Sequence, residues 1–284
     1  MIINYIKLMR PKQWIKNLFV LAALVFSKKF IEIDAIVYSA LLFIYFTLIS
    51  SVIYVFNDLV DADRDKHHPK KKNRPIASGK ITKNKAIFFI IFLVIIACLM
   101  GINFGLNVNL VIALYILNNI FYTFGLKNNI IIDVMMISIG FLLRVVTGAL
   151  VLDVYISSWI IICTFFLSML MALGKRRSEM IALENKASYH RDNLQIYSVK
   201  LIDYMLLICV ACTIITYSLY TILEYESQIF MVTIIFVFYG IFRYVYLLLS
   251  GDGRMPEEII IGDKPLLLDI CIFGISCILI LLYI

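Results

Sequence analysis

One asparagine and three aspartates follow a long apolar run, at Asn57, Asp58, Asp61 and Asp65. If the helix predicted over 35–56 continues for one or two further turns, the aspartates stand at i, i+3 and i+7 and share one face, whereas Asp63 points away from them. Three converging carboxylates repel one another unless a cation lies among them, and hard oxygen ligands suit Mg²⁺ that bridges to a phosphate. The spacing therefore predicts a catalytic Mg²⁺ site with these three aspartates as its ligands.

A basic segment follows this acidic motif and contains Lys70, Lys71, Lys72 and Arg74. Arg and Lys complement phosphate oxygens through charge-assisted hydrogen bonds, so the segment is a candidate phosphate-binding element. The alternative is an acidic helix end followed by ordinary basic residues of a membrane-flanking loop. We favour metal and phosphate binding because the asparagine, the aspartates on one face and the cations occur together at one boundary of an apolar run.

The elements that must position these residues are membrane helices. The chain has 284 residues, of which 62% are hydrophobic and 16% charged, and a mean hydropathy of +0.94, far outside the range of soluble proteins. A membrane crossing needs about 20 apolar residues. Nine runs are candidates, over about 14–29, 35–57, 86–104, 107–125, 130–152, 157–174, 201–223, 229–250 and 265–284. We expect an all-α polytopic membrane protein with nine transmembrane helices in a single domain over 1–284. The first run is short and contains Lys16 and Asn17, so it fits a full crossing least well.

The distribution of cations predicts the topology. Of the 26 Lys and Arg residues, only Lys28 and Lys29, at the end of the first run, are assigned to the outside, and beyond the first run only Arg144 and Arg243 fall within spans. The positive-inside rule then places the amino terminus and the long loops in the cytoplasm, with the protein in the inner membrane and its chemistry on the cytoplasmic side. Topology also accounts for the net charge of +7, so we expect no nucleic-acid partner.

Polar and small residues form a stripe along the fifth run, at Asp133, Gly140, Arg144, Thr147 and Gly148. A charge in the hydrocarbon layer costs at least about 2.5 kcal/mol on insertion scales, so Arg144 is a candidate binding residue. A structural ion pair with an acid of a neighbouring helix is an equally good explanation.

Two further groups of residues flank predicted spans on the cytoplasmic side. Tyr122 and Lys127 precede Asp133, and Lys127 is also explained as an ordinary helix-capping cation. The segment Lys175-Arg-Arg-Ser-Glu179 places three cations and one acid at a helix end, where positive-inside topology explains at least one of the cations.

With these residues in view, the chain resembles the UbiA-type intramembrane prenyltransferase superfamily along its whole length. That family has nine helices, a cytoplasmic cap and an Asn-Asp-x-x-Asp-x-x-x-Asp motif after the second helix, which residues 57–65 match. Within it, the chain is most similar to the decaprenyl-phosphate phosphoribosyltransferase branch. The segments that carry this likeness are 10–17, 74–79, Tyr122 with Lys127 and Asp133, Arg144 with Gly148, 174–179, 217–220, 243–244 and 263–265.

The segment 175–179 separates the branches. Ordinary superfamily members carry a second aspartate-rich motif after the sixth helix, whereas this chain has cations there. Cations suit a site that holds more phosphates than two metal ions neutralise: a 5-phosphate, a diphosphate and a lipid phosphate.

The resemblance implies transfer of 5-phosphoribose from phosphoribosyl pyrophosphate to a polyprenyl phosphate in the lipid bilayer. It implies that Asp58, Asp61 and Asp65 hold Mg²⁺ on the leaving diphosphate. The implied contacts to the sugar phosphate and diphosphate are Lys70, Lys72, Arg74 and Lys127. Those implied for the acceptor phosphate are Arg144, Lys175 and Arg177, and the remaining residues implied in substrate binding are Lys16, Asn57, Tyr122, Asp133 and Glu179.

Two other functions are compatible with the sequence. An aromatic prenyltransferase would bind a prenyl diphosphate on the same aspartates. A transporter or scaffold would line a pathway with Arg144 and Arg243, but the sequence has no inverted repeat or paired discontinuous helices to support it. An oligomer is compatible with all three functions.

Overall fold

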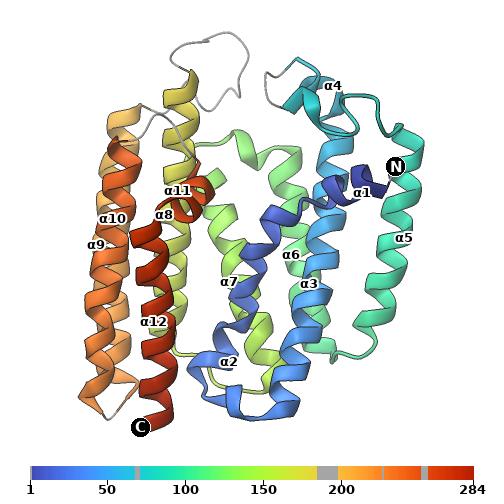
Figure 1. Ribbon diagram of the computed structural model, residues 1–284. Helices are drawn as coiled ribbons and strands as arrows, with labels where there is room; N and C mark the ends of the chain where they lie inside the picture. The colour runs from blue at the N-terminus through green and yellow to red at the C-terminus, as the bar shows by residue number, and fades with distance from the viewer. Residues whose placement is uncertain (1, 68–70, 184–197, 226, 251–254) are drawn as a thin grey trace. The chain divides into compact units, whose positions relative to one another are not determined.

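The computed structural model describes residues 2–67, 71–183, 198–225, 227–250 and 255–284, and these residues form helices and connecting turns without a strand (Figure 1). The all-α prediction is therefore confirmed. The chain divides into two compact units. Unit 1 is Met1–Phe124 with Leu143–Val154, and unit 2 is Gly125–Leu142 with Tyr155–Ile284, so the division falls within α7 (Ile132–Leu152).

Unit 1 is built around α3 (Ile33–Val60), which packs against α1, η1, α5 and α6 (Figure 1). Its core includes Leu42, Phe46 and Val55, all fully buried. Besides α3 and the second half of α7, the unit contains α1 (Ile2–Met9), η1 (Pro11–Leu21), α2 (Ala22–Phe26), η2 (Lys29–Ile31), α4 (Ala62–Asp65), η3 (Lys71–Asn73), α5 (Lys83–Gly101) and α6 (Leu106–Phe124).

The first predicted span takes a different form from the others. It is a 3₁₀-helix, η1, followed by one short α-helix, and eight helices of the described residues are long and apolar enough to cross a membrane. The prediction of nine full-length helices is thus not confirmed. A 3₁₀-helix rises about 2.0 Å per residue against 1.5 Å in an α-helix, so η1 and α2 together extend about 30 Å. That length matches the hydrocarbon layer of a bilayer, about 30 Å thick.

Burial along this segment follows the three-residue period of a 3₁₀-helix, in which residues i and i+3 lie above one another. Asn17, Val20 and Ala23 are all buried. The Asn17 amide donates to Thr47 Oγ1 at 3.1 Å and to Ser50 Oγ at 3.0 Å, which binds η1 to α3. η1 and α2 therefore share one continuous buried face.

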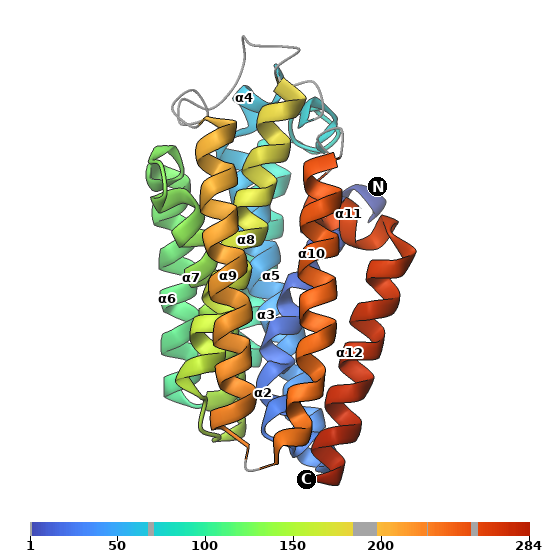
Figure 2. The ribbon, with the colours of Figure 1, turned by 90° about the vertical axis from the view of Figure 1, so that its left-hand side faces the viewer.

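Unit 2 contains the first half of α7 and two long neighbouring helices, α8 (Ser158–Leu183) and α9 (Val199–Leu223), whose core includes Leu170, Leu173 and Ile202 (Figure 2). Its remaining elements are η4 (Leu126–Asn128), η6 (Gln228–Thr233), α10 (Ile234–Ser250), α11 (Pro256–Gly262) and α12 (Lys264–Tyr283). The absence of a side chain at Gly174 brings α8 close to α10, because a Cβ there would lie 2.3 Å from Tyr244 Oη.

Gly148 of α7 should be intolerant of a side chain, because a Cβ at this position would lie 2.1 Å from the Val20 carbonyl oxygen of η1. That oxygen belongs to the backbone, so η1 itself must move. Overpacking of this kind costs about 1–3 kcal/mol. We expect Gly148→Ala to lower the thermal midpoint of the detergent-solubilised protein by several degrees. Gly274→Ala in α12 is the matched control, since its Cβ would meet nothing within 4 Å. An equal midpoint for both variants would contradict the close approach of η1 to α7.

Candidate active site

The acidic motif lies at the end of α3 and in the short helix α4. Asp58 and Asp65 are buried, Asp61 is half-buried at the break between the two helices, and Asp63 is exposed. Asp63 accepts hydrogen bonds from Lys66 and Lys83, both at 2.8 Å, which lower the pKa of its carboxyl to about 2. The predicted separation of Asp63 from the other aspartates is therefore confirmed.

Two guanidinium groups bind the buried carboxylates. Arg74 Nη1 lies 2.6 Å from Asp65 Oδ2 and 3.1 Å from Asp58 Oδ1. Arg10 Nη2 donates to the same Asp58 Oδ1. Arg74 was predicted to contact phosphates, and in this structure it lies between the two aspartates of the motif.

Arg10 is a site residue that the sequence reasoning did not identify. It lies between α1 and η1 with a φ of 52°, in the left-handed region that non-glycine residues seldom adopt. Its guanidinium stands 5.3 Å from the centre of the Tyr54 ring, one turn before Asp58 on α3. The sequence separation of 48 residues between Arg10 and Asp58 leaves no spacing signal by which the pair could be found.

The donor set fits a divalent cation in part. Asp58 and Asp65 are close enough to share one Arg74 nitrogen, so two hard oxygen ligands converge. Mg²⁺ is commonly held by one or two carboxylates together with substrate phosphates. No group of three or more Asp, Glu, His or Cys side chains that could hold a metal occurs among the described residues. The three-ligand Mg²⁺ site remains a prediction.

The other predicted residues of unit 1 lie in varied surroundings. Asn57 Oδ1 accepts a hydrogen bond at 2.7 Å from Thr123 of α6, which connects the motif to that helix. Lys16 and Tyr122 are half-buried and Lys72 is exposed. Lys70 lies outside the described residues.

Arg144 is buried within unit 1, at 4% exposure. Its Nε donates to Asn17 Oδ1 at 2.9 Å and its Nη2 to Tyr115 Oη at 2.8 Å. The guanidinium also lies over the Phe46 and Tyr115 rings, 5.2 and 4.7 Å from their centres. These partners connect η1, α3, α6 and α7, so Arg144 has a structural role within the unit. A contact with the acceptor phosphate remains a prediction.

In unit 2, two arginines of α8 form ion pairs with acids. Arg176, 1% exposed, lies 2.6 Å from both Asp133 of α7 and Glu179 of its own helix. Arg177 lies 2.7 Å from Asp203 of α9 and donates to the Leu248 carbonyl of α10 at 3.0 Å. These pairs were not among the alternatives weighed from the sequence, and they hold α8 against three other helices.

Two predicted lysines complete the description of unit 2. Lys127, at the turn η4, is buried, and Lys175 is half-buried on α8. Neither position by itself decides between phosphate binding and the structural alternatives, so both assignments remain predictions.

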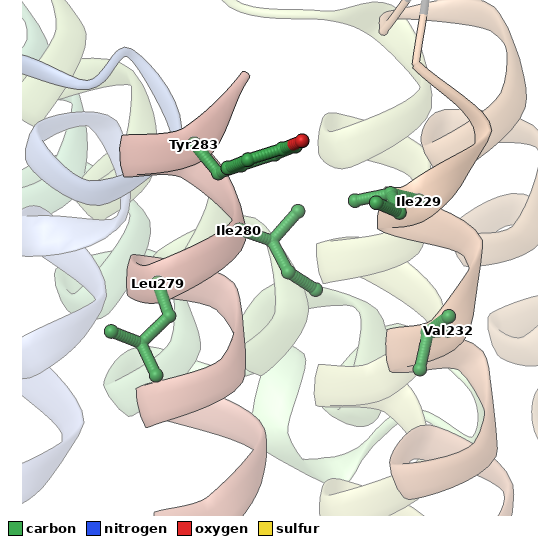
Figure 3. Close-up of a pocket in the computed structure, with 5 residues that line it drawn as sticks. All are labelled: Ile229, Val232, Leu279, Ile280 and Tyr283. Carbon is green, nitrogen blue, oxygen red and sulfur yellow. The ribbon is translucent and has the colours of Figure 1, made fainter.

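A groove between η6 and α12 has a different chemical character (Figure 3). It has a volume of about 390 Å³ and is lined by Ile229, Val232, Leu279, Ile280 and Tyr283. Four of the five lining side chains are aliphatic, and the Tyr283 hydroxyl is the one polar group among them. The lining therefore supplies neither a metal ligand set nor a cation for phosphate, and we do not take the groove as the active site.

Named relatives match this chain over most of its length. A protein of Mycolicibacterium smegmatis named decaprenyl-phosphate phosphoribosyltransferase is 32% identical over 276 residues, which cover 92% of this chain and 87% of the relative. A protein of the same name from Corynebacterium glutamicum is 30% identical, over 98% of this chain and 86% of the relative.

Solved structures show the same fold. A UbiA homologue from Archaeoglobus fulgidus bound to GPP and Mg²⁺ superposes with a TM-score of 0.72 at 19% identity, over 99% of this chain and 97% of the other. Digeranylgeranylglyceryl phosphate synthase superposes with a TM-score of 0.65 at 21% identity, over 100% and 99%. The sequence profile of the UbiA prenyltransferase family matches residues 17–260, and the chain therefore belongs to this family.

Proposed function

We propose that this multi-pass membrane protein transfers 5-phosphoribose from phosphoribosyl pyrophosphate to a polyprenyl phosphate and releases diphosphate. The observation that carries the proposal is the alternation of carboxylates and guanidiniums among Asp58, Asp65, Arg10 and Arg74 at one helix end. Such a set offers ligands both for a divalent cation and for phosphate oxygens. The names of the relatives that match nearly the full chain support the phosphoribosyl branch.

In the proposed reaction, an oxygen of the lipid phosphate forms a bond to C1 of the ribose. The bond between C1 and the diphosphate oxygen breaks, and the diphosphate leaves with the electron pair. No general base is required because the lipid phosphate is already ionised. Asp58, Asp61 and Asp65 would hold Mg²⁺, which neutralises charge on the leaving group when bound. Arg10 and Arg74 would contribute further positive charge to the diphosphate.

Lys175 and Arg177 would contact a substrate phosphate, as the sequence predicts. Lys175 is half-buried on α8, and Arg177 forms an ion pair with Asp203. Arg177, predicted from the sequence as a phosphate ligand, would have to leave Asp203 to act as one. We also propose that the amino terminus, the acidic motif and this segment face the cytoplasm, as the distribution of cations predicts.

An aromatic prenyltransferase is the second candidate, since solved proteins of the same fold are bound to prenyl diphosphates and Mg²⁺. The two functions are separated by one side-by-side assay of the purified protein. Labelled phosphoribosyl pyrophosphate is offered with a polyprenyl phosphate, and a prenyl diphosphate with 4-hydroxybenzoate. We expect product only in the first reaction. Prenyl transfer without phosphoribosyl transfer would overturn the proposal.

Asp58→Asn and Asp61→Asn should each abolish turnover, by at least about a hundredfold in kcat, because each removes an anionic ligand of the cation that stabilises the leaving group. Asp63→Asn is the matched control, since Asp63 is exposed and binds only lysines among the described residues. Initial rates and thermal midpoints of the three variants are compared with the wild type. Activity within a few fold of the wild type for both Asp58→Asn and Asp61→Asn would disprove the metal-site assignment.

Lys175→Gln should lower activity, whereas Arg176→Gln should lower stability. Loss of a charge-assisted hydrogen bond costs about 1.5–3 kcal/mol, so Lys175→Gln should lower kcat/KM at least about tenfold. Arg176→Gln removes the positive charge paired with the fully buried Asp133, and breaking a buried pair in this way typically costs about 3–5 kcal/mol of folding free energy. Kinetics and denaturation of both variants test this. Normal kinetics of folded Lys175→Gln would limit the segment to a structural role.

The proposed topology predicts the labelling of introduced cysteines. In a variant lacking the six native cysteines, Lys72→Cys and Lys175→Cys should react with a membrane-impermeant maleimide only after permeabilisation of the cells. Lys28→Cys, in a loop assigned to the opposite side, should react in intact cells. Reaction of the first two variants from outside would invert the orientation.

A further inference from the structure

The structure places Arg10 on the carboxylate that a divalent cation would need. We propose that Arg10 is an exchangeable counter-ion: it binds Asp58 in the cation-free enzyme, and on cation binding its guanidinium transfers to the phosphate oxygens of the anion that arrives with the cation. This inference rests on the proposed function in one respect, since it takes the acidic motif to be the cation site.

Two guanidiniums lie on a single oxygen of Asp58. Asp58 Oδ1 accepts a hydrogen bond from Arg10 and forms an ion pair with Arg74 Nη1 at 3.1 Å. A divalent cation that binds this oxygen would be repelled by both positive charges, and this repulsion favours release of one guanidinium.

Of the two, Arg10 is the group that can leave. Arg74 lies closer to Asp65, at 2.6 Å, than to Asp58, at 3.1 Å, so it retains an acidic partner when Asp58 is taken. Asp58 is the one acid that Arg10 contacts in the described part of the chain. The Arg10 side chain is also 27% exposed, which leaves room for the guanidinium to turn.

Hydrogen bonds fix the backbone of Arg10, whereas its side chain is partly exposed. The Arg10 amide donates to the Lys7 carbonyl at 3.2 Å, and the Arg10 carbonyl accepts from the Gln13 amide at 2.8 Å. Both bonds keep the left-handed corner between α1 and η1 in place. Exchange of the guanidinium then requires rotation of one side chain and no movement of a helix, and the released charge stays beside the cation.

The consequence is coupling between the two ligands. A cation alone binds weakly because it must displace Arg10, whereas a cation with a diphosphate gives the displaced guanidinium a new partner. By linkage, each ligand raises the affinity for the other by the same factor.

The test measures Mn²⁺ binding to the detergent-purified full-length chain by electron paramagnetic resonance, without anion and with inorganic diphosphate, after correction for their association in solution. For Arg10→Gln we expect Mn²⁺ without anion to bind at least about threefold more tightly, because its competitor is gone. Diphosphate at saturating Mn²⁺ should bind at least about tenfold more weakly, the effect of one lost charge-assisted hydrogen bond.

Arg64→Gln is the matched control, because it removes the same charge from α4 at an exposed position that contacts no carboxylate in the described residues. It should bind both ligands like the wild type. If Arg10→Gln leaves the anion-free Mn²⁺ affinity unchanged or lower, or if Arg64→Gln changes it equally, Arg10 is not a specific competitor and the inference is wrong.

A second variant guards against loss of folding. Arg10→Lys keeps a positive charge without the guanidinium, and its Mn²⁺ affinity without anion should fall between those of the wild type and Arg10→Gln. An affinity outside that interval contradicts the exchange. Failure of the cation site itself gives a different result: Asp58→Asn and Asp65→Asn would then bind Mn²⁺ as the wild type does. Failure of the phosphoribosyl reaction appears only in the transfer assay.

Discussion

The buried carboxylate of Asp58 is the group on which the organisation of unit 1 depends. An ionised acid removed from water is costly unless it is paired and hydrogen-bonded. Arg10 and Arg74 supply that compensation from the two sides of α3 in sequence, one before the first long helix and one after the acidic motif. Their pairing with Asp58 fixes the α1–η1 corner and the segment after α4 at the end of α3. The same charges that would bind substrates thus also hold the local structure together.

Unit 2 meets the same requirement with its own pairs. Arg176 and Asp133 are both almost fully buried, and the pair joins α8 to α7, whereas Arg177 joins α8 to α9 and α10. A run of cations in this part of the chain therefore does not provide three free positive charges. Two of them are matched by acids that lie far away in sequence.

Hydropathy was sufficient to predict most helices, since the cost of unpaired backbone groups in lipid makes apolar runs helical. The runs predicted over 86–104 and 130–152 appear as Lys83–Gly101 and Ile132–Leu152. The periodicity argument also separated Asp63 from Asp58 and Asp65. The partners of the charges were not predictable, because Arg10 and Asp58 are 48 residues apart and Arg144 and Asn17 are 127 apart. Such pairs depend on helix rotation and register, which leave no periodic signal in the sequence.

The 3₁₀ form of η1 connects these separate observations. Arg10 stands directly before it, and Asn17 lies about 14 Å further along at about 2.0 Å per residue. Asn17 is bound to α3 and to Arg144, and Val20 lies against Gly148. The carboxyl-terminal half of η1 is therefore fixed against α3 and α7. A rigid element fixed at that end determines where its first residue stands. Arg144 therefore helps to hold the helix that begins directly after Arg10, and through that helix it influences where Arg10 stands beside Asp58.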